Sequence, residues 1–153
     1  MKLRPADPSE FPTLESMVIE SFAPITWFQR VDRRFGPLNG LDWRARWRLR
    51  LAGVFRGQTI LVGEADGAIV AFASISIDAR TATGFIDLIA VDQRVQRRGY
   101  GRKMLRATLD YMQRHGAAWC GLDCLTDNHG ANALYESEGF SEVARHIRWF
   151  KKL

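Results

Sequence analysis

The N-terminal third of the chain contains two stretches in which apolar residues recur at helical spacing. Asp7, Pro8 and Glu10 form a helix-start signal before the first stretch, and Asp42 is a candidate N-cap before the second. We therefore predict a short first strand in the sequence KLR, followed by two helices and, between them, a loop rich in proline and glycine. The apolar positions are Phe11, Leu14, Val18 and Phe22 in the first helix and Trp43, Trp47, Leu51 and Val54 in the second.

From Thr59 onward the helical period gives way to short runs rich in β-branched and aromatic residues. The runs TILVGE, IVAFASISI and GFIDLIAV are separated by the turn-forming sequences ADG and DARTATG. Runs of this length with turn signals between them are typical of consecutive strands. The pattern predicts a meander of three strands.

Helical and extended patterns alternate in the C-terminal third. Leu105, Leu109 and Met112 mark an amphipathic helix that ends at Gly116. The sequence AWCGLDCL predicts a strand, NHGANALYESEG a short helix that ends at Gly139, and VARHIRWF a final strand. This order predicts a mixed α/β fold, with helices packed on a central sheet, in a single domain that spans residues 1–153.

Composition restricts the class of protein. Hydrophobic residues make up 46% of the chain and charged residues 25%, as in an ordinary globular domain. No apolar run approaches the roughly 20 residues that cross a bilayer, and the polar start MKLRPADPSE is not a signal peptide. Cys120 and Cys124 would lie about 13 Å apart on one strand and cannot pair, which fits a reducing cytoplasm. No Cys/His spacing indicates a metal site.

Positive charge is concentrated in two segments. The net charge is +5, yet Arg30–Arg56 holds eight Arg and two Asp, and Gln93–His115 holds seven Arg or Lys and one Asp. The remainder of the chain is therefore acidic. Two basic segments on an acidic body indicate a site for an anion. For Arg30–Arg56, a solvated helix face explains the charge equally well.

The sequence QRRGYG, residues 96–101, combines the features of a phosphate-binding turn. It follows a predicted strand and opens a predicted helix, whose N-terminus adds its positive dipole end. Gly99 and Gly101 allow a sharp turn in which several backbone N–H groups converge, and Arg97, Arg98 and Arg102 add charge. It is neither a P-loop nor a dinucleotide-binding G-x-G-x-x-G. We predict a site for a diphosphate.

The sequences LIAVDQRVQRRGYGRKML and LDCLTDNHGANALYESEGF resemble the two halves of the signature of the GNAT superfamily of N-acetyltransferases. Gln96, Gly99 and Gly101 fill its acyl-CoA-binding motif, (R/Q)-x-x-G-x-(G/A). The chain is most similar to bacterial ribosomal-protein N-terminal acetyltransferases, over roughly Thr59–Phe150. The resemblance implies a mostly antiparallel sheet of about six to seven strands flanked by about four helices. It also implies that acetyl-CoA (coenzyme A) donates an acetyl group to a primary amine by direct attack in a ternary complex.

The resemblance also implies roles for individual residues. Backbone groups of Ile89, Ala90 and Val91 would pair with the pantetheine arm, in a gap where the strands Phe85–Val91 and Ala118–Leu125 splay apart. Asn128 would bond the pantetheine or order the next helix, and Tyr135 would act as general acid at the thioester sulfur. The pyrophosphate would be held by the backbone of Gln96, Arg97, Arg98, Gly99, Tyr100 and Gly101, with Arg102 nearby.

Two carboxylates are candidates for the general base, and a reaction without a protein base is the third alternative. Asp123 stands where the most similar relatives carry a Glu described as the base, but Asp is shorter and would need a water relay. Asp87 lies inside the apolar run GFIDLIAV, where a carboxylate requires a reason. Each is equally explained as a solvent-facing or salt-bridged residue, and water alone can serve. His115 and His129 are expected at a helix end and in a turn.

The resemblance implies that the acceptor is an amine of a small molecule, an amino acid or a peptide N-terminus. Trp27 and Phe28 are candidates for an apolar acceptor pocket, whereas Trp43 and Trp47 are expected in the core. One alternative is a non-catalytic CoA-binding module, which Tyr135 disfavours. Another is a basic nucleic-acid-binding domain, which the lack of interleaved exposed aromatics disfavours. We expect acetyl-CoA and the amine as partners, without nucleic acid or membrane, in a monomer or homodimer.

Overall fold

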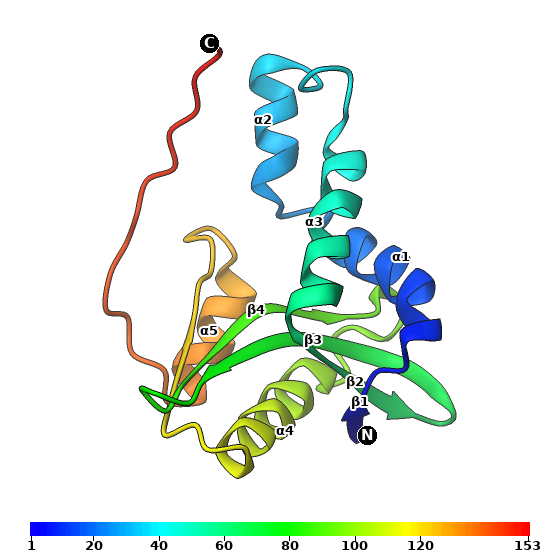
Figure 1. Ribbon diagram of the computed structural model, residues 1–153, viewed down its shortest axis with the longest axis vertical. Coiled ribbons are helices and arrows are strands. Elements are labelled where there is room, and N and C mark those ends of the chain that lie inside the picture. The colour runs from blue at the N-terminus through cyan, green and yellow to red at the C-terminus, as the bar shows by residue number, and fades with distance from the viewer.

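The computed structural model describes every residue of the chain, 1–153. Helices lie on both faces of one sheet (Figure 1). In chain order the elements are β1 Lys2–Pro5, α1 Phe11–Phe22, α2 Trp27–Phe35, α3 Trp43–Gly57, β2 Thr59–Ala65, β3 Ala68–Asp78, β4 Thr83–Val91, α4 Tyr100–Arg114, β5 Trp119–Leu122 and α5 His129–Ser137. The mixed α/β fold class is confirmed. The five strands are fewer, and the five α-helices one more, than the resemblance implied.

The strands of the sheet follow one another in the order β1-β2-β3-β4-β5. The first four are antiparallel neighbours, so β2, β3 and β4 form the predicted meander. β5 joins β4 in parallel, and their pairing covers only Thr83–Ile86 and Trp119–Leu122. Parallel neighbours require a crossover connection, and α4 supplies it.

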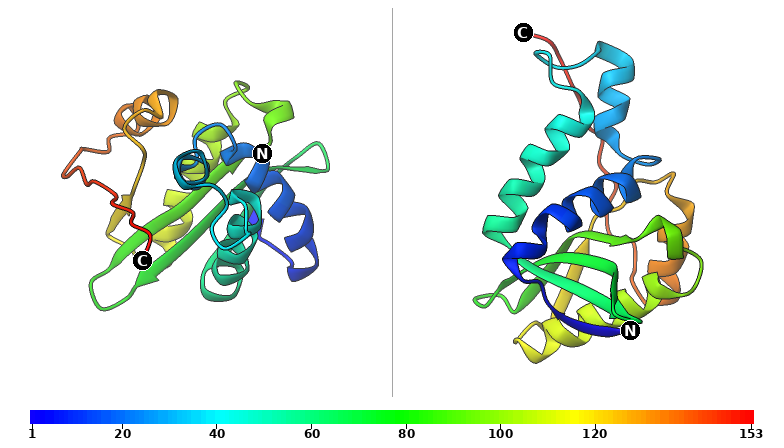
Figure 2. Two further views of the ribbon diagram at one scale, coloured as in Figure 1. Left: turned by 90° about the horizontal axis from the view of Figure 1, so that it is seen from above. Right: turned by 90° about the vertical axis from the view of Figure 1, so that its right-hand side faces the viewer.

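Each face of the sheet has its own apolar core, because helices cover both faces (Figure 2, right). α1 and α3 pack against one face, and α4 packs against the other. The first core contains Leu14, Trp47, Leu51, Phe72 and Leu88, and the second contains Leu61, Ile75, Ile86, Met104 and Leu105. A sheet covered on both faces explains why the strand sequences are nearly continuous apolar runs rather than strict alternations.

Local signals in the sequence set the ends of several helices, as predicted. Asp7 and Glu10 form a reciprocal capping box at the 3-10 turn Pro8–Glu10, which leads into α1. The Asp42 carboxylate accepts a hydrogen bond from Ala45 N–H at 2.8 Å and caps α3. His115 is the C-cap of α4, which fits its predicted place at a helix end.

The predicted loop between the first two helices contains a further helix, α2, which stands away from the sheet beside α3 (Figure 1). Its N-cap is Thr26, whose Oγ1 accepts a hydrogen bond from Phe28 N–H at 3.3 Å. Only Val31 is buried in the sequence WFQRVDRRF. The apolar residues of this segment do keep helical spacing, but the proline and glycine residues around it led to the loop prediction.

The final strand predicted over VARHIRWF is absent. Residues 141–153 have no regular structure and run along the outside of the molecule toward α2 (Figures 1 and 2). The side chains of Val143, Ile147 and Trp149 are 95%, 75% and 85% exposed. A strand forms only where a neighbour satisfies its backbone hydrogen bonds, and an alternating sequence does not supply that neighbour. β5 therefore remains the edge of the sheet.

Two buried threonine hydroxyls form a matched pair for a stability test. Thr26 Oγ1 accepts a hydrogen bond from Nε1 of the buried Trp47 at 2.7 Å, whereas Thr108 Oγ1 on α4 has no partner. We expect Thr26→Val to lower the free energy of unfolding by about 1–3 kcal/mol, because it leaves the indole N–H unpaired and removes the side-chain cap of α2. Thr108→Val should leave it unchanged or raise it. Urea titrations measure both, and equal losses would contradict this account.

Candidate functional site

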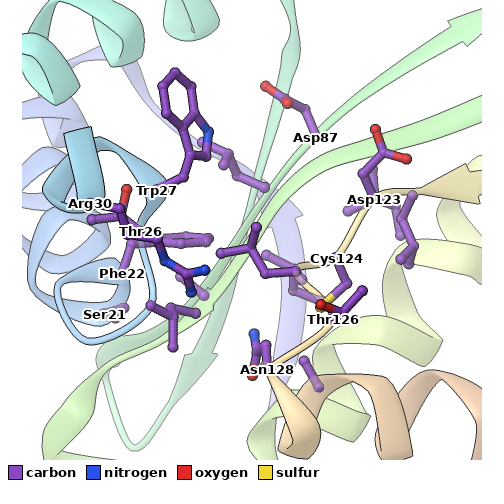
Figure 3. Close-up of a pocket in the computed structure, with 18 of the residues that line it drawn as sticks. Ser21, Phe22, Thr26, Trp27, Arg30, Asp87, Asp123, Cys124, Thr126 and Asn128 are labelled. Atoms are coloured by element: carbon purple, nitrogen blue, oxygen red, sulfur yellow. The ribbon is translucent and has the colours of Figure 1, made fainter. Parts of the chain in front are cut away.

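A large pocket lies where β4 and β5 separate. The strands pair as far as Ile86 and Leu122 and diverge beyond, as predicted for this pair. A cavity of about 1130 Å³ occupies the gap, lined from α1 to α5 and by the C-terminal segment. In Figure 3, the carboxylates of Asp87 and Asp123 lie toward one end of the pocket and Asn128 lies toward the other. The pocket therefore has two chemically different ends.

A β-bulge at Asp87 marks the point where the strands part. Ser74 of β3 pairs with Leu88, and its neighbour Ile75 pairs with Ile86, so β4 has one residue more than β3 here. A bulge bends a strand and redirects its side chains. Accordingly, Ile86 packs with α4, whereas Leu88, two residues later, packs in the core under α1 and α3. The extra residue, Asp87, lines the pocket.

Beyond the bulge, one edge of β4 faces the gap without a strand neighbour. Asp92 N–H bonds Val70 O on the β3 side at 3.0 Å. Antiparallel hydrogen bonds alternate along a strand, so Ala90 also directs its backbone groups to β3. Ile89 and Val91 consequently present theirs to the gap. Of the three residues predicted to pair with the pantetheine arm, Ala90 directs its backbone groups away from the gap.

The carbonyl of Val91 is already held from two directions. It accepts hydrogen bonds from Ser21 Oγ at 2.9 Å and from Gln96 Nε2 at 3.2 Å. The Gln96 side chain thus ties the start of the glycine loop to the end of β4. These contacts leave the N–H of Val91 and both backbone groups of Ile89 directed to the gap.

The glycine loop leads directly into the N-terminus of α4. Gly99 is the N-cap, with a left-handed φ of +80°, and Arg97 also has a positive φ, +62°. Lys103 N–H makes the first hydrogen bond of the helix, to Gly99 O at 3.1 Å. The preceding N–H groups have no intrahelical acceptor, and no acidic side chain lies in the first turn. This arrangement is suited to an anion.

The basic residues around this loop divide into free and paired side chains. Arg97 and Arg98 form no ion pair, and both are exposed. Arg102, predicted near the diphosphate, instead donates to Glu138 at the end of α5, as does Arg106 at 2.6 Å. The Arg102 side chain therefore braces α4 against α5, and the side-chain charge free for an anion comes from Arg97 and Arg98.

Tyr135, Cys124 and Asn128 line the same part of the pocket. The Tyr135 hydroxyl makes no hydrogen bond within the protein. Burial, with a smaller effect of Cys124, raises its pKa to about 12, so the phenol keeps its proton at neutral pH. Burial also raises the pKa of the Cys124 thiol, which favours the thiol over the thiolate. Asn128 is the N-cap of α5, but its side chain does not cap the helix.

The two candidate carboxylates have different surroundings. Asp87 accepts hydrogen bonds from Arg50 Nη2 at 2.6 Å and from Gln58 Nε2 at 3.2 Å, one on each oxygen. Asp123 follows β5 directly, is exposed and forms no ion pair or hydrogen bond. Asp87 is therefore the salt-bridged residue of the two predicted alternatives, and Asp123 the solvent-facing one.

The aromatic residues of the N-terminal third lie in the core or at the pocket as predicted, with one exception. Trp43 and Trp47 are 7% and 2% exposed and belong to the core. Trp27 lines the pocket. Phe28, one residue along α2, packs edge-on against Trp47, with ring centroids 5.4 Å apart, and is turned away from the cavity.

Sequence reasoning missed several residues that shape this site. Asn132 Nδ2 donates to Leu125 O at 2.9 Å and fixes the loop before α5. Arg30 of α2 donates to both oxygens of Asp127, at 2.9 and 2.8 Å, and links the two sides of the pocket. The Arg30–Asp127 pair joins residues 97 positions apart, and no local pattern signals such a contact.

Comparison with known proteins identifies the family. The model of the acetyltransferase (GNAT) family matches residues 25–140, so the chain belongs to that family. The [ribosomal protein bS18]-alanine N-acetyltransferase of Escherichia coli K12 is 40% identical over 78 residues, 51% of each chain. The N-alpha-acetyltransferase RimI of Mycobacterium tuberculosis is 39% identical over 87 residues, 56% of this chain and 53% of that protein. The match thus spans about half the length of these relatives.

Solved structures share the fold. The ribosomal-protein-S18-alanine N-acetyltransferase of Escherichia coli superposes with a TM-score of 0.70 at 22% identity, covering 94% of this chain and 79% of that one. An aminoglycoside N-acetyltransferase, AAC(6')-Iy, solved in complex with CoA, superposes with a TM-score of 0.68 at 16% identity, covering 99% and 95%. None of the helices in the present structure is long and apolar enough to cross a membrane.

The left-handed conformation of Gly99 allows a test of the loop. We expect Gly99→Val to weaken coenzyme A binding at least about tenfold, because a β-branched residue resists this φ and the loop N–H groups would turn away. Gly67 has a similar φ, +75°, in the β2–β3 turn and is the matched control. Isothermal titration calorimetry measures both. Equal affinity in Gly99→Val and Gly67→Val would contradict a role for this turn.

Proposed function

We propose that the protein is an acetyl-CoA-dependent N-acetyltransferase that moves an acetyl group to a primary amine by direct attack in a ternary complex. One observation carries this proposal. A single pocket joins a glycine turn at the N-terminus of α4 to an open β4 edge and to the unbonded hydroxyl of Tyr135. Family membership and the CoA complex of a similarly folded acetyltransferase support it.

The residues present fit coenzyme A. The free N–H groups at the start of α4, with Arg97 and Arg98, would hold the diphosphate. The N–H of Val91 and the carbonyl of Ile89 would pair with the amides of the pantetheine arm as an added strand does. Arg102 would contribute through its brace to Glu138 rather than by direct contact. Asn128, beside Cys124, would bond the pantetheine.

Beyond binding, acetyl transfer requires three chemical contributions from the protein. The amine must be deprotonated before it attacks, because an ammonium has no lone pair. The carbonyl oxygen needs a donor as negative charge develops, and the N–H of Ile89, which is directed to the gap, would supply it. The departing sulfur needs a proton, which Tyr135 would donate because its phenol is protonated at neutral pH and lines the same pocket.

Asp123 is the better placed of the two carboxylates to receive the proton of the amine. Its oxygens are unoccupied and its side chain lies at the end of the pocket away from Asn128 (Figure 3). Both oxygens of Asp87 already accept hydrogen bonds. We therefore assign Asp87 to positioning Arg50 and the bulge. Asp123 would act directly or through one water.

The nucleic-acid-binding alternative loses support from the arrangement of the arginines. Alternate residues of α3 each pair with a carboxylate: Arg44 with Glu20, Arg46 with Asp32, Arg48 with Glu15 and Arg50 with Asp87. Charge that is paired internally is not available to phosphates along a nucleic acid. The non-catalytic CoA-binding module keeps the same pocket, and only turnover separates it from an enzyme. A cytoplasmic location and a monomer or homodimer remain predictions.

Replacement of Tyr135 tests the enzyme assignment. We expect Tyr135→Phe to lower kcat about 10²-fold, because the leaving thiolate loses its proton donor. Coenzyme A affinity should change less than about twofold. Tyr111→Phe is the control, since Tyr111 stacks on His115 outside the pocket. Release of free thiol from acetyl-CoA with a panel of amines measures kcat. An unchanged kcat in Tyr135→Phe removes the acid role, and absent turnover in wild type favours the non-catalytic module.

The two carboxylates can be separated in the same assay. We expect Asp123→Asn to lower kcat at least about tenfold with unchanged thermal stability, because it removes only a proton acceptor. Asp87→Asn should instead lower the melting temperature, because it weakens the pairing of the partly buried Arg50. A loss of kcat confined to Asp87→Asn would reverse the assignment.

A further inference from the structure

The end of the pocket that holds Asp87 and Asp123 is walled by α2 and the C-terminal segment. The guanidinium of Arg148 lies over the Trp27 ring, 4.1 Å from its centroid. The ring of Phe150 packs against Phe35, with centroids 6.1 Å apart. All four side chains line the pocket. These contacts make the irregular segment a wall of the acceptor end.

Some of the charged side chains at this end of the pocket have no partner of opposite charge. Arg30 is paired with Asp127, and Arg50 is paired with Asp87. Arg34 and Arg148 also line the pocket, but neither forms an ion pair or a hydrogen bond to any carboxylate in the structure. One carboxylate, Asp123, is also without a partner. The acceptor end therefore offers two free guanidinium groups, one free carboxylate and a surface of aromatic rings.

We propose that the acceptor is a free amino acid with an aromatic or large apolar side chain. This inference rests on the proposed acetyl transfer. Its amino group would face Asp123, its carboxylate would bind Arg34 and Arg148, and its side chain would pack on Trp27 and Phe35. Arginine suits this task because its planar fork of donors matches a carboxylate, and aromatic rings pack well against a flat apolar side chain.

The same features select against other amines. A polyamine would bring several positive charges to an end of the pocket that already has unpaired arginines, and like charges repel. A peptide N-terminus has no carboxylate on the residue that is acetylated, so it would gain no ion pair at that position with the two exposed guanidinium groups. The free amino acid satisfies both the positive and the negative groups of the site.

The first test compares acceptors that differ in one group. Acetyl transfer from acetyl-CoA is measured with L-phenylalanine, L-phenylalaninamide and spermidine. We expect kcat/KM to be at least about tenfold higher for phenylalanine than for its amide, a difference of about 1.4 kcal/mol. The amide has the less basic amino group and therefore more free amine, so this bias works against the expected result. Equal values for the acid and the amide, or a preference for spermidine or for peptides, overturn the inference.

The second test removes one guanidinium at a time. Arg34→Gln and Arg148→Gln should each lower kcat/KM for phenylalanine about tenfold and leave that for phenylalaninamide unchanged. The KM for acetyl-CoA should not change. Arg33→Gln is the control, because Arg33 is the neighbour of Arg34 on α2, bonds Gln29 and does not line the pocket. If Arg34→Gln and Arg148→Gln behave like Arg33→Gln, the inference is wrong.

Failure of this inference is distinguishable from failure of the proposed function. Acetylation of amines without preference for a carboxylate leaves the enzyme assignment intact and removes only the acceptor class. Absence of acetyl-CoA binding by calorimetry, or of thiol release with every amine, removes both.

Discussion

β4 and β5 stop pairing after Ile86 and Leu122, and the extra residue Asp87 bends β4 away at that point. An unpaired strand edge inside a protein is costly unless something satisfies its N–H and C=O groups. The free backbone groups of Ile89 and Val91 are therefore suited to hydrogen bonding with an extended ligand that carries amides. The glycine turn, the start of α4 and the helix that carries Tyr135 are all placed around this open edge. The pocket and its chemistry depend on this short pairing.

The parts of this arrangement that depend on neighbours in sequence could be predicted. Asp7, Asp42 and Gly99 act within a few residues of themselves, and each begins its helix or turn as expected. The meander followed from runs joined by short turns. The divergence of β4 and β5 was predicted from the family resemblance together with the position of the glycine turn. A local sequence pattern does not indicate where two parallel strands separate.

The parts that depend on partners distant in sequence could not be predicted. The tail was wrongly predicted as a strand because alternation reveals nothing about a neighbour. α2 was missed for a different reason, namely the proline and glycine residues around its helically spaced apolar positions. The ion pair of Arg102 could not be predicted because its partner, Glu138, is 36 residues away. Charge in a sequence indicates electrostatic potential, whereas pairing determines which charges remain free.

Glu138 has a consequence of its own. Its carboxylate, only 7% exposed, is shared by Arg102 near the start of α4 and Arg106 one turn later, and it sits at the end of the helix that carries Tyr135. The N-terminus of α4 and the helix that carries Tyr135 are thereby held at a fixed separation. If the proposed function is correct, a thioester on a much shorter or longer arm would not reach both the diphosphate site and the Tyr135 hydroxyl. Glu138 would then contribute to selection of the donor without contacting it.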